Sequence, residues 1–197
     1  MKFRITLAAA TLAMTASAHA QTVVSVDTGE SAHACYAAAK TGIEPKSGIA
    51  DCNAALTSGL SAENRAATLD NRGFLFDRVK DYVSAWSDFN ASICVNPELG
   101  DPYLNRGVAL IRLTRLDEAV VDINKGITLG VSLPQIGYYD LAVAEELMGR
   151  VTDAYHDYKR ALVSDPEYAP ATEALKRFKV TTTPAPANSG PAAGKSL

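Results

Sequence analysis

The sequence predicts an all-α protein, built as a right-handed solenoid of stacked helix hairpins. Two observations predict this fold. A segment of about 34 residues repeats along the chain, and each copy holds two stretches in which apolar residues recur at helical spacing. A single hairpin of this size cannot bury its own apolar face, so successive copies are expected to stack on one another.

The repeat is clearest at Gly73 and Gly107, which are 34 residues apart and each follow an Asn-Arg pair. Downstream, an alanine followed four positions later by a large apolar residue occurs three times, at Ala85 and Phe89, Ala119 and Ile123, and Ala154 and Tyr158. Small residues allow two helix axes to approach closely, and the ring of Phe89 is expected to fill the space beside Gly73. Each copy is therefore predicted to be one hairpin.

This pattern resembles the tetratricopeptide repeat (TPR), whose signature distributes aromatic, small and proline residues over 34 residues. The resemblance covers residues 65–168 in three copies, 66–99, 100–133 and 135–168. A weaker copy precedes these three. Residues 21–64 are expected to form a degenerate hairpin, because residues 48–56 align with residues 85–93.

The copies depart from the family pattern at two kinds of position. Arg72 and Arg106 stand where the family usually has leucine, and we interpret them as tolerated because an arginine stem can lie along apolar surface. The middle copy has Val131 in place of the terminal proline, with Gly126 and Gly130 nearby. Its second helix is therefore expected to fray or to end early.

Both termini lie outside the repeats. Residues 1–20 combine a positive start, a short apolar stretch and small residues on either side of His19, so they are expected to be a secretory signal peptide. The mature chain would begin at Gln21 in the periplasm of a Gram-negative bacterium, with secretion as the alternative. Residues 169–179 are expected to form a capping helix, and the Pro/Ala-rich residues 180–197 a disordered tail.

Charge and motifs exclude several functions. Loss of Lys2 and Arg4 with the signal changes the net charge from −3 to −5, which argues against nucleic acid as a partner. No segment has the roughly 20 apolar residues of a membrane-spanning helix. Nucleophile elbows and glycine-rich phosphate loops are missing from the sequence, so we expect neither catalysis nor a cofactor. His33 with the nearby cysteines matches no zinc spacing, so no metal is expected.

The resemblance also places the cysteines. Cys52 aligns with the core aromatic residue of the second helix, and Cys35 lies on the first helix of the same degenerate hairpin. We predict a disulfide between them, worth about 3 kcal/mol by the chain-entropy estimate. Two reduced thiols, or a pairing with Cys94, are the alternatives. Cys94 is otherwise expected to be free or to join two chains in a homo-oligomer.

In resembling proteins, the first helices line a concave groove that holds an extended peptide or a partner helix. An asparagine two positions before the small residue contacts the peptide backbone there, which corresponds to Asn71, Asn105 and Asp140 in this chain. The resemblance implies a partner-binding groove formed by Asn71, Phe74, Arg78, Asn105, Val108, Arg112, Tyr139, Asp140 and Val143. We therefore expect a scaffold or adaptor that binds a protein or peptide of the cell envelope.

Three alternatives stay open. The asparagines could instead bond neighbouring repeats, and the chain's own termini could fill the groove. The protein could also bind cell-wall glycan, with Phe74 and Tyr139 as stacking platforms, or assist an envelope enzyme. The lysine and arginine set with which some family members hold an acidic peptide carboxy terminus is missing here, so such a ligand is not expected.

Overall fold

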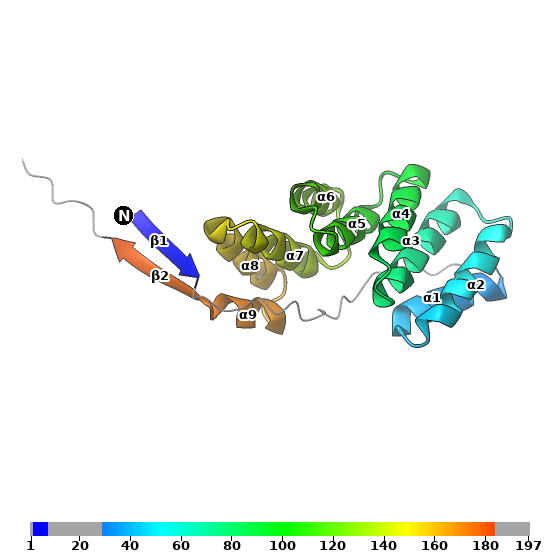
Figure 1. The fold of residues 1–197 in the computed structure, drawn as a ribbon, viewed down its shortest axis with the longest axis horizontal. Coiled ribbons are helices and arrows are strands. Elements are labelled where there is room, and N and C mark those ends of the chain that lie inside the picture. The colour runs from blue at the N-terminus through cyan, green and yellow to red at the C-terminus, as the bar shows by residue number, and fades with distance from the viewer. Residues whose placement is uncertain (1, 8–28, 184–197) are drawn as a thin grey trace, which may run out of the picture.

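The computed structural model describes residues 2–7 and 29–183. Its helices are α1 (Glu30–Thr41), α2 (Pro45–Thr57), α3 (Ala62–Arg78), α4 (Tyr82–Val95), α5 (Gly100–Arg112), α6 (Leu116–Leu129), α7 (Pro134–Leu147), α8 (Val151–Ser164) and α9 (Ala169–Leu175). Two strands, β1 (Lys2–Leu7) and β2 (Phe178–Thr183), pair antiparallel. Figure 1 shows an elongated molecule with α1 and α2 at one end and the two strands at the other.

The predicted all-α architecture of sequential hairpins is confirmed. Helices α1–α8 pack as four consecutive pairs, and each pair also contacts the next one. Inside the α3–α4 hairpin, a Cβ atom on Gly73 would lie 2.7 Å from the ring of Phe89. At the equivalent place in the next hairpin, a Cβ on Gly107 would lie 2.5 Å from Ile123. These glycines allow the close helix approach that the sequence predicted.

The turn inside each of the last three hairpins has one common geometry. Lys80, Thr114 and Gly149 occupy equivalent positions and adopt left-handed φ angles of 65°, 58° and 75°. The next residue then donates its backbone N–H to a carbonyl five residues earlier, as Arg115 does to Leu110 at 2.9 Å. This arrangement satisfies carbonyls at the helix end, so the chain reverses in the same way in each copy.

Helix α6 corrects one expectation. It does not fray or end early but runs for 14 residues, as long as α4 and α8. Gly126 lies inside the helix and is buried, and a Cβ there would lie 2.8 Å from the carbonyl oxygen of Gly100. The glycine therefore lets the start of α5 pack closely on α6. The helix ends at Gly130, whose φ is 94°.

The carboxyl end differs from the expected helix and tail. The capping helix α9 ends at Leu175 rather than at residue 179, and β2 occupies residues 178–183. Val180 and the threonines after it explain the strand, because β-branched side chains favour extended backbone. The strand covers the first residues of the predicted tail, and residues 184–197 lie outside the described part. Likewise β1 lies within the predicted signal peptide, most of which is outside the described residues.

Candidate functional site

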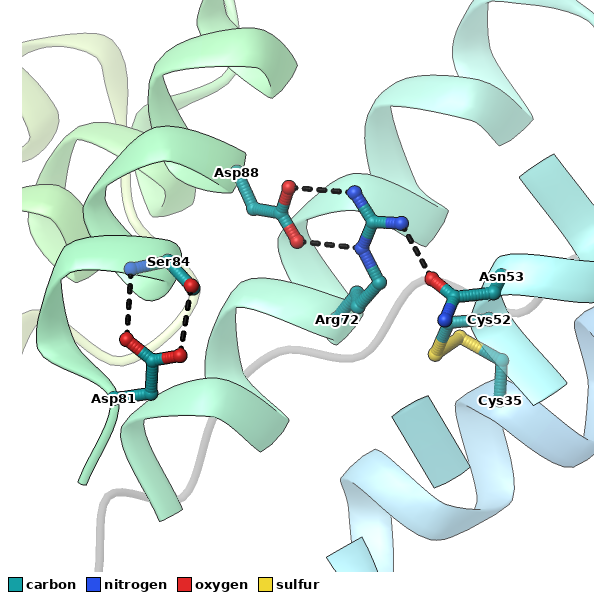
Figure 2. Close-up of polar contacts among 7 residues, drawn as sticks. All are labelled: Cys35, Cys52, Asn53, Arg72, Asp81, Ser84 and Asp88. Atoms are coloured by element: carbon teal, nitrogen blue, oxygen red, sulfur yellow. Dashed lines mark hydrogen bonds and ion pairs between the residues drawn. A yellow bond between two sulfur atoms is a disulfide. The ribbon is translucent and has the colours of Figure 1, made fainter. Parts of the chain in front are cut away.

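Arg72 connects three helices. Its Nε and Nη2 donate to the two carboxylate oxygens of Asp88 on α4 at 2.6 and 2.7 Å, and its Nη1 donates to Asn53 Oδ1 on α2 at 2.6 Å. Figure 2 shows this arginine between Asp88 and Asn53, with the Cys35–Cys52 disulfide beside Asn53. The arginine is more than a tolerated replacement for leucine, because it bonds the two helices of its own hairpin and the preceding hairpin at once.

The next hairpin repeats this clamp. Arg106 donates to Asp122 through Nε at 2.7 Å and Nη2 at 2.8 Å, and to Asn90 Oδ1 at 2.8 Å. These hydrogen bonds to Asp122 raise the pKa of the Arg106 guanidinium. In the last hairpin the position is Leu141, so α7 has no such arginine. Sequence reasoning missed the clamps, although the aspartates and asparagines recur with the repeat.

The predicted disulfide is present between Cys35 on α1 and Cys52 on α2. Both residues are fully buried, in a small cluster that also contains Ala39, Phe74 and Leu75. The bridge therefore joins the two helices of the first hairpin where few large apolar side chains are available. Cys94 is a free and exposed thiol.

Asn105 and Asn71, two of the predicted groove residues, differ in their hydrogen bonding. Asn105 Nδ2 on α5 donates to both carboxylate oxygens of Asp70 on α3, at 3.1 and 3.2 Å. This bond joins neighbouring repeats, as one of the alternatives anticipated. Asn71 is 4% exposed, and its Nδ2 has no hydrogen-bond partner among the described residues. The two asparagines therefore have different environments.

The next turn of each first helix carries an apolar residue and then an arginine. Phe74 and Val108 are buried at equivalent positions on α3 and α5. The Arg78 guanidinium lies 5.9 Å from the centre of the Phe74 ring, and Arg78 itself is exposed. Arg112 is half-buried at the corresponding position of α5.

In the last repeat, the predicted groove residues belong to an aromatic cluster. Tyr139 contacts the rings of Tyr158 and Tyr168, with centroids 5.4 and 5.7 Å away. Val143 packs against the same cluster, and Asp140 is buried beside them. The chain's own carboxyl-terminal segment therefore covers this end of the predicted groove.

Glu146 fastens that segment in place. Its carboxylate accepts two hydrogen bonds from Arg177, at 2.7 and 2.8 Å, and one from the Tyr158 hydroxyl at 2.9 Å. Burial, together with the negative charge of Glu146, raises the pKa of Tyr158. Arg177 follows α9, so this ion pair holds the junction of α9 and β2 against α7.

Two further carboxyl groups have shifted acidities. Burial raises the pKa of Asp70 to about 7 in spite of its bond to Asn105. Burial, with repulsion from Asp157, raises the pKa of Glu145 to about 7. The described residues contain no group of three or more His, Cys, Asp or Glu side chains placed to hold a metal. Nor is any helix in residues 29–183 long and apolar enough to cross a membrane.

Comparisons with known proteins agree with this architecture. No protein-family model matches the chain. The chain is 29% identical over 107 residues to the DnaJ homolog subfamily C member 7 homolog of Dictyostelium discoideum, covering 51% of this chain and 19% of that protein. It is 36% identical over 98 residues to small glutamine-rich tetratricopeptide repeat-containing protein 2 of Saccharomyces cerevisiae, covering 50% of this chain and 28% of that protein. The chain thus spans less than a third of either relative's length.

Solved structures show the same fold. PilW, a widely conserved type IV pilus biogenesis factor, aligns with a TM-score of 0.67 at 21% identity, over 76% of this chain and 69% of its own. MamA aligns with a TM-score of 0.61 at 16% identity, over 77% of this chain and 82% of its own. The first TPR of Spaghetti (RPAP3), bound to the HSP90 peptide SRMEEVD, aligns with a TM-score of 0.55 at 23% identity. The alignment covers 58% of this chain and 90% of that one. The chain therefore has the same fold as these structures, which include TPR domains.

Proposed function

We propose that this TPR-fold chain is a non-enzymatic scaffold of the bacterial cell envelope, which binds an extended peptide or a partner helix along α3 and α5. The observation that carries the proposal is the environment of Asn71. Its amide nitrogen is buried and lacks a hydrogen-bond partner in the described part of the chain. A buried unsatisfied donor costs about 1–3 kcal/mol, and a carbonyl of a bound backbone would remove that cost after a small side-chain rotation.

Neighbouring residues suit this role. Arg78 lies seven positions after Asn71, on the same face of α3, and is exposed. It can meet a carboxylate or a carbonyl of the same ligand. Asn105 is already bonded to Asp70, so we assign it to the repeat interface and not to the ligand. The proposed surface is therefore centred on Asn71, Phe74 and Arg78, and it extends to Val108 and Arg112.

The partner is expected to differ from the acidic peptide of the RPAP3 complex. The set of lysines and arginines with which TPR proteins hold an acidic carboxy terminus is missing from this chain. A segment recognised mainly through its backbone fits better. The last repeat contributes less, because α9 and its flanking residues already cover Tyr139, Asp140 and Val143.

Cell-wall glycan is a weaker candidate. Stacking a sugar requires a free aromatic face. Phe74 is buried and lies beneath the Arg78 guanidinium, and Tyr139 is already packed against Tyr158 and Tyr168. We therefore favour a protein or peptide ligand.

A periplasmic location is part of the proposal. It rests on the signal-like residues 1–20 and on the buried Cys35–Cys52 disulfide. Disulfides of this kind persist in oxidising compartments such as the periplasm and are rare in the cytosol.

The test is a pulldown from envelope extract with the wild type, Asn71→Ala and Arg78→Ala. Asn124→Ala and Lys125→Ala on α6 are the matched controls, since both residues are exposed on a second helix. Circular dichroism and urea unfolding check that each variant is folded. The proposed surface is supported if a protein co-purifies with the wild type and both controls and its recovered amount is at least fivefold lower with each of the two α3 variants. Equal recovery by all five proteins would overturn it.

A further inference from the structure

The end of the solenoid that holds α8, α9 and β2 already receives an extended segment. In the β1–β2 pair, Leu7 lies opposite Phe178 and Ile5 lies opposite Val180. Opposite residues of an antiparallel pair project from the same face of the ribbon. Ile5 and Leu7 pack with Phe178 against the apolar cluster of the last hairpin. Figure 1 shows β1 alongside β2 at this end of the molecule.

The apolar surface at this end of the molecule extends beyond the part that β1 covers. A cavity of about 370 Å³ lies between α8, the end of α9 and β2, and all its lining residues come from those three elements. The lining is mainly apolar and includes Leu162, Val163 and Leu175. Val163 is 84% exposed and Val180 is 45% exposed. β1 therefore leaves apolar surface uncovered next to itself.

β1 also lies within residues 1–20, which are expected to be removed on export. Removal would unpair one edge of β2 and uncover the part of the cluster that Ile5 and Leu7 protect. An unpaired strand edge beside apolar surface is a template for another strand. We infer that in the exported protein this strand-acceptor surface, formed by β2 and α8, binds an extended segment of another protein. That segment carries two large aliphatic residues at alternate positions, in place of Ile5 and Leu7.

A second copy of the chain fits this surface less well. Self-pairing would place β2 of one copy against β2 of the other. That strand offers one free aliphatic residue, Val180, because Phe178 is already buried in its own cluster. The other residues of β2 are Lys179 and three threonines, which cannot replace two aliphatic side chains. A foreign strand therefore matches the surface better.

The test begins with the full chain, exported by a Gram-negative host and purified from the periplasm, with its amino terminus sequenced. Fluorescence anisotropy then measures binding of a labelled peptide with the sequence of residues 2–7. The comparison peptide carries Ile5→Asp and Leu7→Asp. We expect the processed protein to bind the first peptide at least tenfold more tightly than the second, because only the first fills the apolar face.

Three protein variants test where the peptide binds. Val180→Asp, opposite Ile5 on β2, should weaken peptide binding at least tenfold. Val121→Asp, which changes another exposed valine on α6, should leave it unchanged, as should Asn71→Ala on the other proposed surface. The inference is overturned if the purified chain still begins at Met1, or if neither peptide binds. It is also overturned if the Val180→Asp and Val121→Asp variants bind the peptide equally well. A dimer that depends on Val180 and prevents peptide binding would overturn it too.

Discussion

Arg72 and Asp88 form a bidentate ion pair across the α3–α4 hairpin, with N–O distances of 2.6 and 2.7 Å. Asp88 is 6% exposed, so its charge depends on this arginine for compensation. The third donor of Arg72 reaches Asn53 of the preceding hairpin. One side chain thus sets both the packing within a repeat and the stacking between repeats, and Arg106 does the same one repeat later.

Removing the arginine should be costly. Arg72→Ala leaves a buried carboxylate without a partner, and we expect a loss of about 3 kcal/mol in the free energy of unfolding, measured in urea. The Arg72→Leu and Asp88→Leu double variant removes both charges and should recover at least half of that loss. A double variant as unstable as Arg72→Ala would contradict the ion-pair explanation.

The Cys35–Cys52 disulfide should stabilise the first hairpin. In a Cys94→Ser background, replacing both bridged cysteines by serine should reduce the free energy of unfolding by about 3 kcal/mol. Because the bridge lies between α1 and α2, hydrogen exchange should accelerate in those helices before it does in α5–α8. A reductant should reproduce the effect in the Cys94→Ser protein and change nothing in the serine variant. Uniform acceleration along the chain would contradict a local role.

Gly73→Ala should destabilise the α3–α4 hairpin. The added Cβ would lie 2.7 Å from Cε1 of Phe89, and overpacking of this kind costs about 1–3 kcal/mol. Phe89→Leu shortens the opposing side chain, so the pair of substitutions should cost less than the sum of the two single ones in thermal or urea unfolding. Simple additivity would show that the glycine is not needed for this contact.

Asp70 should make stability depend on pH. Its pKa is raised from 3.8 to about 7 in the folded protein, so the folded state holds the proton more tightly than the unfolded state. Stability linked to this group is therefore complete below about pH 4 and falls as the pH rises towards 7. Asp70→Asn should remove this fall, and should be more stable than wild type at pH 8 but not at pH 4.

The control for that experiment is Glu98→Gln, at an exposed position in the turn before α5. It should leave the pH profile unchanged. Glu145, with its pKa also raised to about 7, contributes in the same direction, so some slope should persist in Asp70→Asn. A profile in which Asp70→Asn matches wild type from pH 4 to pH 8 would refute the role of this residue.

The sequence predicted the hairpins well because their determinants are local and repeat. Gly73, Ala85 and Phe89 recur at fixed offsets, and those offsets are what two close helices require. The disulfide was predicted for the same reason, since Cys35 and Cys52 occupy facing positions of one hairpin. Helix α6 was misjudged because Gly126 was read as a local helix breaker, whereas its contact with Gly100 makes it a packing residue.

The sequence by itself determined the repeat length, the helix pairs and the residues that pack inside each pair, because helix periodicity fixes which side chains share a face. Only the tertiary structure decided what the polar residues between repeats do. It bonded Asn105 to Asp70 and joined Arg177 to Glu146, and within residues 2–7 and 29–183 it left the Asn71 amide nitrogen without a hydrogen-bond partner. Those outcomes depend on how neighbouring hairpins meet, and contacts between segments distant in the chain have no local signature in the sequence.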